Sequence, residues 1–295
     1  MKLLNDYLRE TFGCKVYKIA LNAGCTCPNR DGTLGTGGCI FCSAGGSGEF
    51  AEDAARSITE QIEAGKARVA RKIKDGKYIA YFQAYTNTYA PVEHLRTLYM
   101  EAAGHPDIVA VSIATRPDCL QEDVLDLLEE MSRIKPVWVE LGLQTIHPKT
   151  AAYIRQGYDF LVYDRAVREL RSRGIEVITH VILGLPGESV PEMLETVRYV
   201  CDSGATGIKL QLLHVLKGTD LEKEYLEGKV RVLSEDEYLD ILEQCLHVIP
   251  EDVVIHRLTG DGDKRLLVAP LWSGDKKHVW NRIQRMIDSM GSVKR

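Results

Sequence analysis

Apolar runs and amphipathic segments alternate along most of the chain, and this pattern predicts strands and helices in alternation. The apolar runs are rich in Val, Ile and Leu and show little polar alternation, which is typical of strands covered on both faces. Strands are predicted at residues 16–21, 78–85, 108–113, 137–143, 176–183 and 207–213, with a short one at 253–255. Helices are predicted at 1–13, 54–74, 92–103, 120–133, 160–173, 190–203, 234–247 and 275–290.

Repeated β-then-α units indicate an α/β fold with a parallel sheet. The connections are right-handed, so the units either wind into a barrel or divide over both faces of an open sheet. Polar residues near the carboxyl ends of successive strands favour the barrel, because parallel barrels carry their active sites there. These residues are Gln83, Thr115, Arg116, Glu140, Gln144, His180, Gln211 and His214. Since there is no internal repeat or linker, we expect a single domain over 1–295, with a core at about 14–220 and a C-terminal extension at about 221–295.

Charge and hydropathy narrow the class of protein further. The 295 residues carry a formal net charge of −5, which argues against a generally basic nucleic-acid-binding protein but allows a local basic patch. No apolar run approaches the ~18 residues of a membrane span, and the first seven residues lack the apolar stretch of a signal peptide, so we expect a cytoplasmic protein with no membrane partner. Two basic stretches are present: Lys66, Arg68, Arg71, Lys72, Lys74 and Lys77, and then Lys276, Lys277, Arg282, Arg285, Lys294 and Arg295.

Four of the eight cysteines fall within eighteen residues, in a glycine-rich loop after the first predicted strand. In the cytoplasm such clusters are more often metal ligands or catalytic thiols than disulfides. Cys39 and Cys42 form a C-x-x-C pair, and Cys25 or Cys27 supplies a thiol upstream. A structural zinc needs four ligands, and a thioredoxin-like dithiol needs a helix start after the pair. The third alternative is an iron–sulfur cluster held by three thiolates, with one iron open and the Phe41 ring beside it.

The sequence around these cysteines resembles the radical S-adenosylmethionine (SAM) superfamily, in which three cysteines ending in Cys-x-aromatic-Cys follow the first strand of a (βα) chain. Its long spacing resembles the branch containing the radical SAM domain of the Elongator catalytic subunit. Residues 26–32 (TCPNRDG) and 37–42 (GGCIFC) resemble a small bacterial family known as YhcC and YtqA. The resemblance implies that Cys27, Cys39 and Cys42 hold a [4Fe-4S] cluster and that Cys25 does not.

Further motifs extend the resemblance over nearly the whole chain, at residues 115–118 (TRPD), 140–145 (ELGLQT), 180–187 (HVILGLPG) and 217–219 (KGT). It implies a partial (βα)6 TIM-like barrel with N- and C-terminal extensions. The implied contacts to SAM are Phe41, Gln83, Thr115, Gln144, Arg155 and His180, of which the last three match positions around SAM in related enzymes. One position departs from the pattern: Elongator-like sequences have Glu where this chain has Ala114, so the ribose contact must differ.

The resemblance also implies the reaction. The reduced cluster cleaves SAM to methionine and a 5′-deoxyadenosyl radical, which abstracts a hydrogen atom from the substrate. Relatives on the Elongator branch modify the wobble uridine of tRNA, and YtqA-type proteins are linked to conversion of its 5-carboxymethylaminomethyl form to the 5-aminomethyl form. We therefore expect tRNA as the substrate and an electron donor such as flavodoxin or ferredoxin. A small metabolite, favoured by the acidic pI of about 5.9, is an alternative substrate, and a non-enzymatic zinc-binding scaffold is a third hypothesis.

Overall fold

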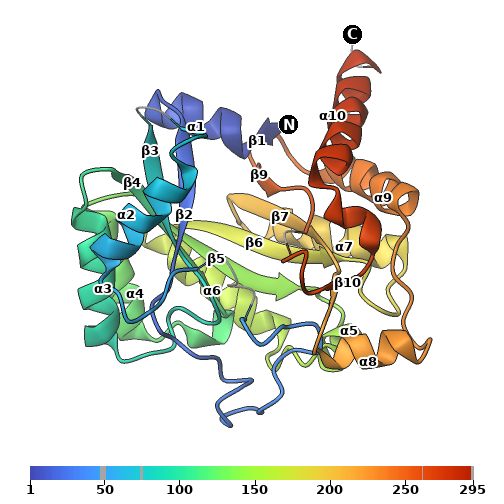
Figure 1. Cartoon of the computed structure of the whole chain (residues 1–295), viewed down its shortest axis with the longest axis horizontal. Coiled ribbons are helices and arrows are strands. Elements are labelled where there is room, and N and C mark those ends of the chain that lie inside the picture. Colours follow the sequence, from blue (N-terminus) through green and yellow to red (C-terminus); the bar gives the residue numbers. More distant parts are fainter. Residues whose placement is uncertain (47–50, 74–75, 261, 294–295) are drawn as a thin grey trace.

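A sheet of eight parallel strands forms the centre of the molecule (Figure 1). The computed structural model describes residues 1–46, 51–73, 76–260 and 262–293. Six strands come from the predicted β-then-α units and pair in chain order, so the α/β fold is confirmed. They are β2 (Val16–Leu21), β3 (Lys77–Phe82), β4 (Ile108–Thr115), β5 (Val137–Gln144), β6 (Glu176–Leu183) and β7 (Gly207–Leu212).

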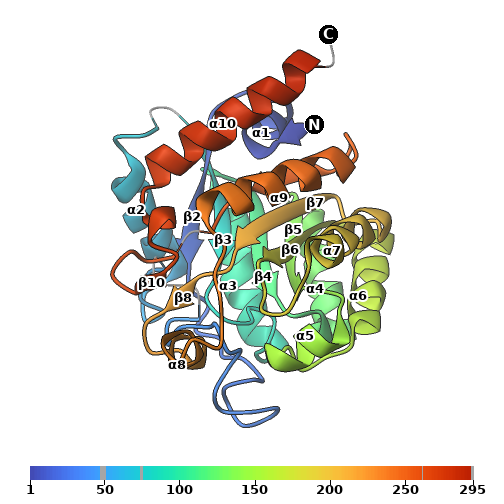
Figure 2. The same cartoon turned by 90° about the vertical axis from the view of Figure 1, so that its right-hand side faces the viewer.

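The sheet curls into an open half-barrel, as a contact across its concave face shows. In a flat sheet β2 and β5 would lie three strand spacings, or about 14 Å, apart. Instead, Lys18 Nζ on β2 is 2.6 Å from Glu140 Oε1 on β5, and Lys209 on β7 contacts the same carboxylate. The strands therefore bend around a central space, with helices on the outer face (Figures 1 and 2), and the TIM-like architecture is confirmed.

Two further strands extend the sheet beyond β7, in the order β7-β9-β1. β9 (Val254–Arg257) was predicted almost at its observed place, whereas β1 (Lys2–Leu3) was predicted to be helical. The prediction was wrong there because two residues carry too little periodicity to reveal a strand. β2 and β1 are the two edges of the curled sheet.

Capping boxes mark where three of the long helices begin. α2 begins at Ile58 rather than at residue 54, because Ser57 and Glu60 form a reciprocal capping box. The same device, with Ser then Glu three residues later, starts α7 and α9. The long helices are α2 (Ile58–Val69), α3 (Val92–Gly104), α4 (Glu122–Ser132), α6 (Phe160–Ser172), α7 (Val190–Asp202), α9 (Glu235–Val248) and α10 (Lys276–Val293).

The amino end of the half-barrel is filled by the helix α1 (Leu4–Phe12). Its Leu8 packs with Val16, Trp138 and Ile178 from the strands, and the Tyr7 ring lies 6.0 Å from that of Trp138. The interior is therefore open towards the carboxyl ends of the strands, where the cysteine loop lies.

Several short elements were not predicted. They are the helices α5 (Pro148–Tyr153) and α8 (Asp220–Leu226), the antiparallel strands β8 (Val215–Leu216) and β10 (Leu267–Ala269), and the 3-10 turns η1 (Pro117–Cys119) and η2 (Leu271–Gly274). Among them, α5, α8, β8 and β10 pack around Ile40 of the cysteine loop. Ile40 anchors the loop among them, because its backbone bonds to Ile154 and Leu221 at 3.3 and 3.0 Å. Figure 1 shows the loop beside α5 and α8.

Candidate active site

Two side chains of the segment that follows Cys27 hold the cysteine loop in shape. Asn29, which is buried, donates from Nδ2 to Cys39 Sγ at 3.4 Å. Arg30 Nη2 donates to the Cys42 carbonyl at 2.8 Å. The backbone turns at Cys27, whose carbonyl accepts from the Arg30 amide at 2.8 Å. The Asn-Arg pair of the motif therefore ties the first cysteine to the Cys-x-x-Cys turn.

The three predicted ligand thiols, Cys27, Cys39 and Cys42, line one cavity. Burial raises the pKa of Cys39 to about 11, and the neighbouring Cys42 and Cys27 act in the same direction. The thiols are thus close enough to repel one another as thiolates, which metal binding would offset. Across the described residues, no three His, Cys, Asp or Glu side chains already stand close enough to hold a single metal ion. The fit to a cluster therefore rests on the donor set and its shared cavity.

The fourth cysteine of the loop, Cys25, has a different environment. Its side chain belongs to the main hydrophobic core and the residue is 8% exposed. Burial raises the pKa of its thiol to about 12, so it stays protonated at neutral pH. Because burial also raises the pKa of Cys39, it is the core position of Cys25 that agrees with its expected absence from the ligand set.

Five of the six predicted SAM contacts line the same cavity as the cysteines. They are Phe41, Gln83, Thr115, Gln144 and His180, and the strand ends of β3, β4, β5 and β6 bring the last four together. Thr115 Oγ1 is 2.5 Å from Thr88 Oγ1, so its hydroxyl is already engaged. Ala114, where Elongator-like sequences have Glu, also lies on the cavity wall.

Two glutamines give the cavity unsatisfied polar atoms. Gln144 sits at the end of β5 with φ 65°, and its Oε1 is buried without a hydrogen-bond partner. Gln156 is 3% exposed, and both its Nε2 and Oε1 lack partners. Buried amide groups without partners are costly, so the cavity suits a polar ligand such as SAM. Gln156 had not been predicted, because a Gln in a loop carries no periodic signal.

Arg155 is the predicted contact that the structure places elsewhere. It is absent from the cavity wall, and its Nη1 lies 2.7 Å from Asp220 Oδ2 at the start of α8. The ion pair is half exposed, so its net strength is small. The backbone carbonyl of Arg155 does contribute to the site, since it accepts a hydrogen bond from Asn29 Nδ2 at 2.7 Å. Carboxylate binding by its side chain stays a prediction, and it requires the Asp220 pair to open.

A buried ionic network centred on Glu140 reaches the cavity wall, since both Glu140 and His180 line the cavity. Its carboxylate accepts from Lys18 at 2.6 Å, from Ser112 at 2.7 Å, from His180 Nε2 at 2.8 Å and from Lys209. Burial acts to raise the pKa of Glu140, but its charged and hydrogen-bonding partners hold this pKa well below its usual range. Burial, and then the Lys209 charge, lower the pKa of His180 to about 4, so this imidazole is neutral.

His180 therefore has both ring nitrogens engaged inside the protein. Its Nε2 donates to Glu140, and its Nδ1 accepts from Gln211 Nε2 at 3.2 Å. The sequence identified His180 as a polar strand residue and, by resemblance, as a contact to SAM, but it gave no sign of these two partners. A role of His180 at the cofactor stays a prediction. Its two partners, Glu140 and Gln211, impose the orientation in which the ring would act.

Arg116 and Tyr158 complete the cavity wall. Arg116 forms a two-pronged ion pair with Asp118 at 2.9 and 2.8 Å, and its guanidinium lies 5.0 Å from the centre of the Tyr158 ring. The Tyr158 hydroxyl donates to the Gly142 carbonyl. The TRPD motif signalled Arg116, but nothing in the sequence connected it with Tyr158.

Comparison with known proteins identifies the class to which this fold and cysteine site belong. The chain belongs to the radical SAM superfamily, which residues 26–200 match, while residues 205–289 match the radical SAM C-terminal domain. It is 48% identical to YtqA of Bacillus subtilis over 289 residues, which are 98% of this chain and 90% of YtqA. It is 40% identical to YhcC of Escherichia coli over 296 residues, which are 98% of this chain and 94% of YhcC. The resemblance to the YhcC and YtqA family is confirmed.

More distant relatives connect the chain with the Elongator branch. It is 26% identical to the tRNA uridine(34) acetyltransferase of Methanocaldococcus jannaschii over 156 residues, 52% of this chain and 28% of that protein. The solved structure of Methanocaldococcus infernus Elp3 superposes with a TM-score of 0.65 at 18% identity, covering 86% of this chain and 58% of that one. This last likeness supports the fold alone.

Superfamily membership makes the chain a radical SAM enzyme, and the family implies both SAM and a [4Fe-4S] cluster. The hypothesis of a non-enzymatic zinc scaffold is therefore not retained. Across the part of the chain that the structure describes, no helix has the length and hydropathy needed to cross a lipid bilayer.

Proposed function

We propose that this radical SAM enzyme modifies the wobble uridine of tRNA, converting its 5-carboxymethylaminomethyl form to the 5-aminomethyl form. The observation that carries the proposal is the sequence relationship to a tRNA uridine(34) acetyltransferase, which extends over half of this chain. The match covers 28% of that relative, so the proposal takes from it only the target base, uridine 34 of tRNA.

The cofactors supply a 5′-deoxyadenosyl radical when cluster and SAM are bound. The residues of this chain position and shield that chemistry. Cys27, Cys39 and Cys42 would hold the cluster, and the unpartnered Gln144 oxygen and Gln156 amide would bind polar groups of SAM. The proposal includes an electron donor such as flavodoxin or ferredoxin, which would supply the electron that the chemistry of the cluster requires.

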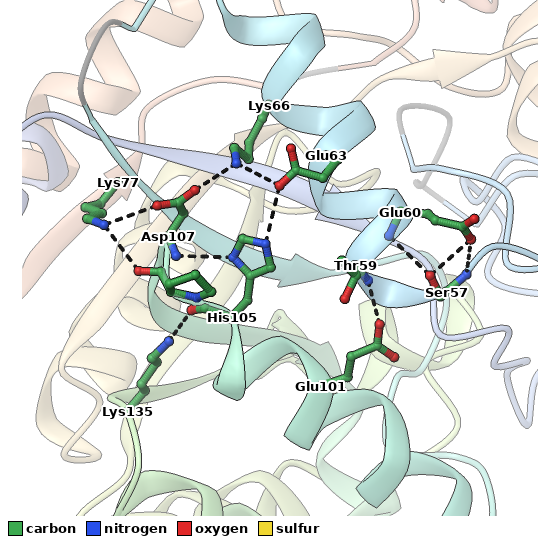
Figure 3. A network of polar contacts seen from close by, with 11 residues as sticks. Ser57, Thr59, Glu60, Glu63, Lys66, Lys77, Glu101, His105, Asp107 and Lys135 are labelled. Carbon is green, nitrogen blue, oxygen red and sulfur yellow. Dashed lines mark hydrogen bonds and ion pairs between the residues drawn. The ribbon is translucent and has the colours of Figure 1, made fainter.

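The first basic stretch is a poor candidate for the tRNA contact, because its lysines are engaged within the protein. Figure 3 shows Lys66 and Lys77 directed at Asp107, with distances of 2.7 and 3.2 Å. Lys66 also pairs with Glu63 at 2.7 Å. Lys74 lies outside the described residues. These pairs join α2 to the start of β4 and serve the fold.

The second stretch lies on α10, where Lys276, Lys277 and Arg285 are exposed. Arg282 pairs with Asp236 at 2.7 Å, while Trp280 is 44% exposed on the same helix. An exposed indole beside cations suits stacking with an unpaired base. Lys294 and Arg295 lie outside the described residues. Contact between α10 and tRNA belongs to the proposal.

The test is a nucleoside profile of tRNA from a strain that lacks the gene, measured by mass spectrometry. We expect 5-carboxymethylaminomethyl-uridine to accumulate and the 5-aminomethyl form and its products to disappear. The wild-type gene and a Cys14→Ala variant should restore the profile, whereas Cys39→Ala should not. Unchanged wobble uridines would refute the tRNA proposal.

A second candidate is a small-metabolite substrate, which the net charge of −5 favours. An unchanged tRNA profile combined with SAM cleavage by the purified enzyme would support it.

A further inference from the structure

A second cavity lies between the two edges of the half-barrel, and its wall is basic. It is formed by α1, β2 and α2 on one side and by β9 and the start of α10 on the other. Its cationic lining residues are Lys18, Arg68, Lys72, Lys209, Arg257 and Lys276, and none of the described residues that line it is acidic. We call it the edge cavity.

The edge cavity adjoins the candidate active site. Tyr81 and Gln83 line both cavities, so the two cavities meet at these residues. Lys18 and Lys209 stand at this inner end, with their ammonium groups 5.0 and 4.8 Å from the centre of the Tyr81 ring. A group bound there would lie directly behind the site where SAM and the reacting base are expected.

The inner end holds more positive than negative charge. Lys18 and Lys209 share the single carboxylate of Glu140, and the third partner of that carboxylate, His180, is neutral. The Lys18 side chain is 21% exposed and that of Lys209 only 4%. Buried ammonium groups need a full set of acceptors, and a bound anion would supply the missing ones.

The protonation of Lys209 reflects this imbalance. Burial, together with nearby Lys18 and Arg257, lowers its pKa to about 7, although Glu140 opposes the shift. The groups facing it are Lys18 on β2, Tyr81 on β3, Glu140 on β5, His180 on β6, and His256 and Arg257 on β9. An anion placed among them favours the protonated amine and raises its pKa.

The outer cations are less available than the inner pair. Arg68 forms an ion pair with Glu52, and Lys72 Nζ lies 3.4 Å from the Tyr17 hydroxyl. The inner lysines therefore define the strongest anion-binding position in the edge cavity.

We propose that Lys18 and Lys209 bind an oxyanion of the substrate, either a carboxylate on the side chain of the base or a phosphate of the nucleotide. The inference rests on the proposed function for the nature of the substrate and extends it to a specificity site. Substrate bound in this way reaches past Tyr81 and Gln83, with its anionic group in the edge cavity and its reacting atom towards SAM.

The test is lysine NMR on the full-length, cluster-loaded enzyme, labelled with ¹³C at the lysine ε carbon. The signal of Lys209 is the one that titrates near pH 7 and is missing in Lys209→Met. Inorganic phosphate and glycolate are the probes for the two oxyanions. We expect at least one of them to raise this pKa by about one unit, equivalent to tenfold tighter binding to the protonated amine.

Two variants make the result specific. In Lys18→Gln the Lys209 signal remains, and the shift caused by the anion should fall at least by half. Lys66→Gln is the matched control, because Lys66 is a paired lysine with a similar exposure of 23% outside both cavities, and it should leave the shift unchanged.

The outcomes distinguish a carboxylate from a phosphate as the bound oxyanion, and they distinguish this inference from the proposed function. A shift with phosphate alone assigns the position to the nucleotide phosphate, and a shift with glycolate alone assigns it to a carboxylate; both together support a general oxyanion position. No shift with either probe, or an undiminished shift in Lys18→Gln, would overturn the inference. Because no tRNA is used, an unchanged tRNA profile would refute the proposed function and leave this result standing.

Discussion

Replacing Glu140 by glutamine tests the buried network at the centre of the half-barrel. The carboxylate is fully buried and accepts from Lys18, Lys209, His180 and Ser112. Glutamine keeps the size of the side chain, but it removes the negative charge and turns one acceptor into a donor. Two buried ammonium groups then lose their compensating charge.

The expected loss of stability is large enough to measure easily. Breaking a buried ion pair from one side costs about 3–5 kcal/mol. A chain of 295 residues has an unfolding entropy of roughly 0.6 kcal/mol/K, from about 2.1 cal/mol/K per residue. Glu140→Gln should therefore lower Tm by roughly 5–8 °C, in thermal unfolding followed by far-UV circular dichroism.

A surface ion pair provides the matched control. Glu130 pairs with Arg96 and its side chain is 48% exposed, so Glu130→Gln should cost less than about 1 kcal/mol. The double variant Glu140→Gln/Lys209→Met removes a cation along with the carboxylate, and its loss should be smaller than the sum of the two single losses. If Glu140→Gln melts within 2 °C of the wild type, Glu140 does not compensate the charges of Lys18 and Lys209 as described above.

Three further predictions concern the cavity, the pH response and packing. In equilibrium dialysis, Gln144→Leu should weaken SAM binding roughly fivefold, which is equivalent to one hydrogen bond of about 1 kcal/mol. The control Gln244→Leu, at an exposed position, should bind SAM as the wild type does. Equal affinities of the two variants would remove Gln144 from the site. Because the pKa of His180 is lowered to about 4, its neutral form stabilises the fold above pH 6.5, and this contribution is lost as pH falls from 6.5 to 4. Over that range, the urea midpoint of His180→Gln should fall less steeply with pH than that of the wild type. Parallel curves for the two proteins would contradict the assignment. Gly207→Ala places a Cβ 2.8 Å from the His256 ring and should lower the stability measured by urea unfolding by about 1–3 kcal/mol. Gly104→Ala, whose Cβ meets nothing within 4 Å, should leave the stability nearly unchanged. Equal stability of the two variants would show that the ring can move.

The sequence predicts most of the fold because buried parallel strands leave long apolar runs. The strands and long helices of the β-then-α units lie where that pattern puts them, apart from their ends. The prediction extended β3 to residue 85, but the strand ends at Phe82, because the apolar composition continues into the loop. Short elements such as β1, β8 and β10 escape prediction, since tertiary pairing rather than local pattern creates them.

The candidate site could be predicted only as far as motifs reach. The cysteine ligands and SAM contacts were identified, and the structure brings all of them but Arg155 to one cavity, whereas the predicted strand-end residues Gln211 and His214 line a different one. The curl of the sheet determines the rest. Lys18 and Lys209 are 191 positions apart in the chain and meet only because β2 and β7 bend towards one carboxylate. No periodicity records such a contact.

The most direct measurement of the central claim is anaerobic reconstitution with iron and sulfide, followed by assay of iron and of 5′-deoxyadenosine under a reductant. The account predicts about four irons per chain and reductive cleavage of SAM for the wild type and for Cys25→Ala, and neither property for Cys27→Ala. A wild-type protein that binds zinc in place of the cluster, or a Cys27→Ala variant that keeps its iron and cleaves SAM, would contradict it.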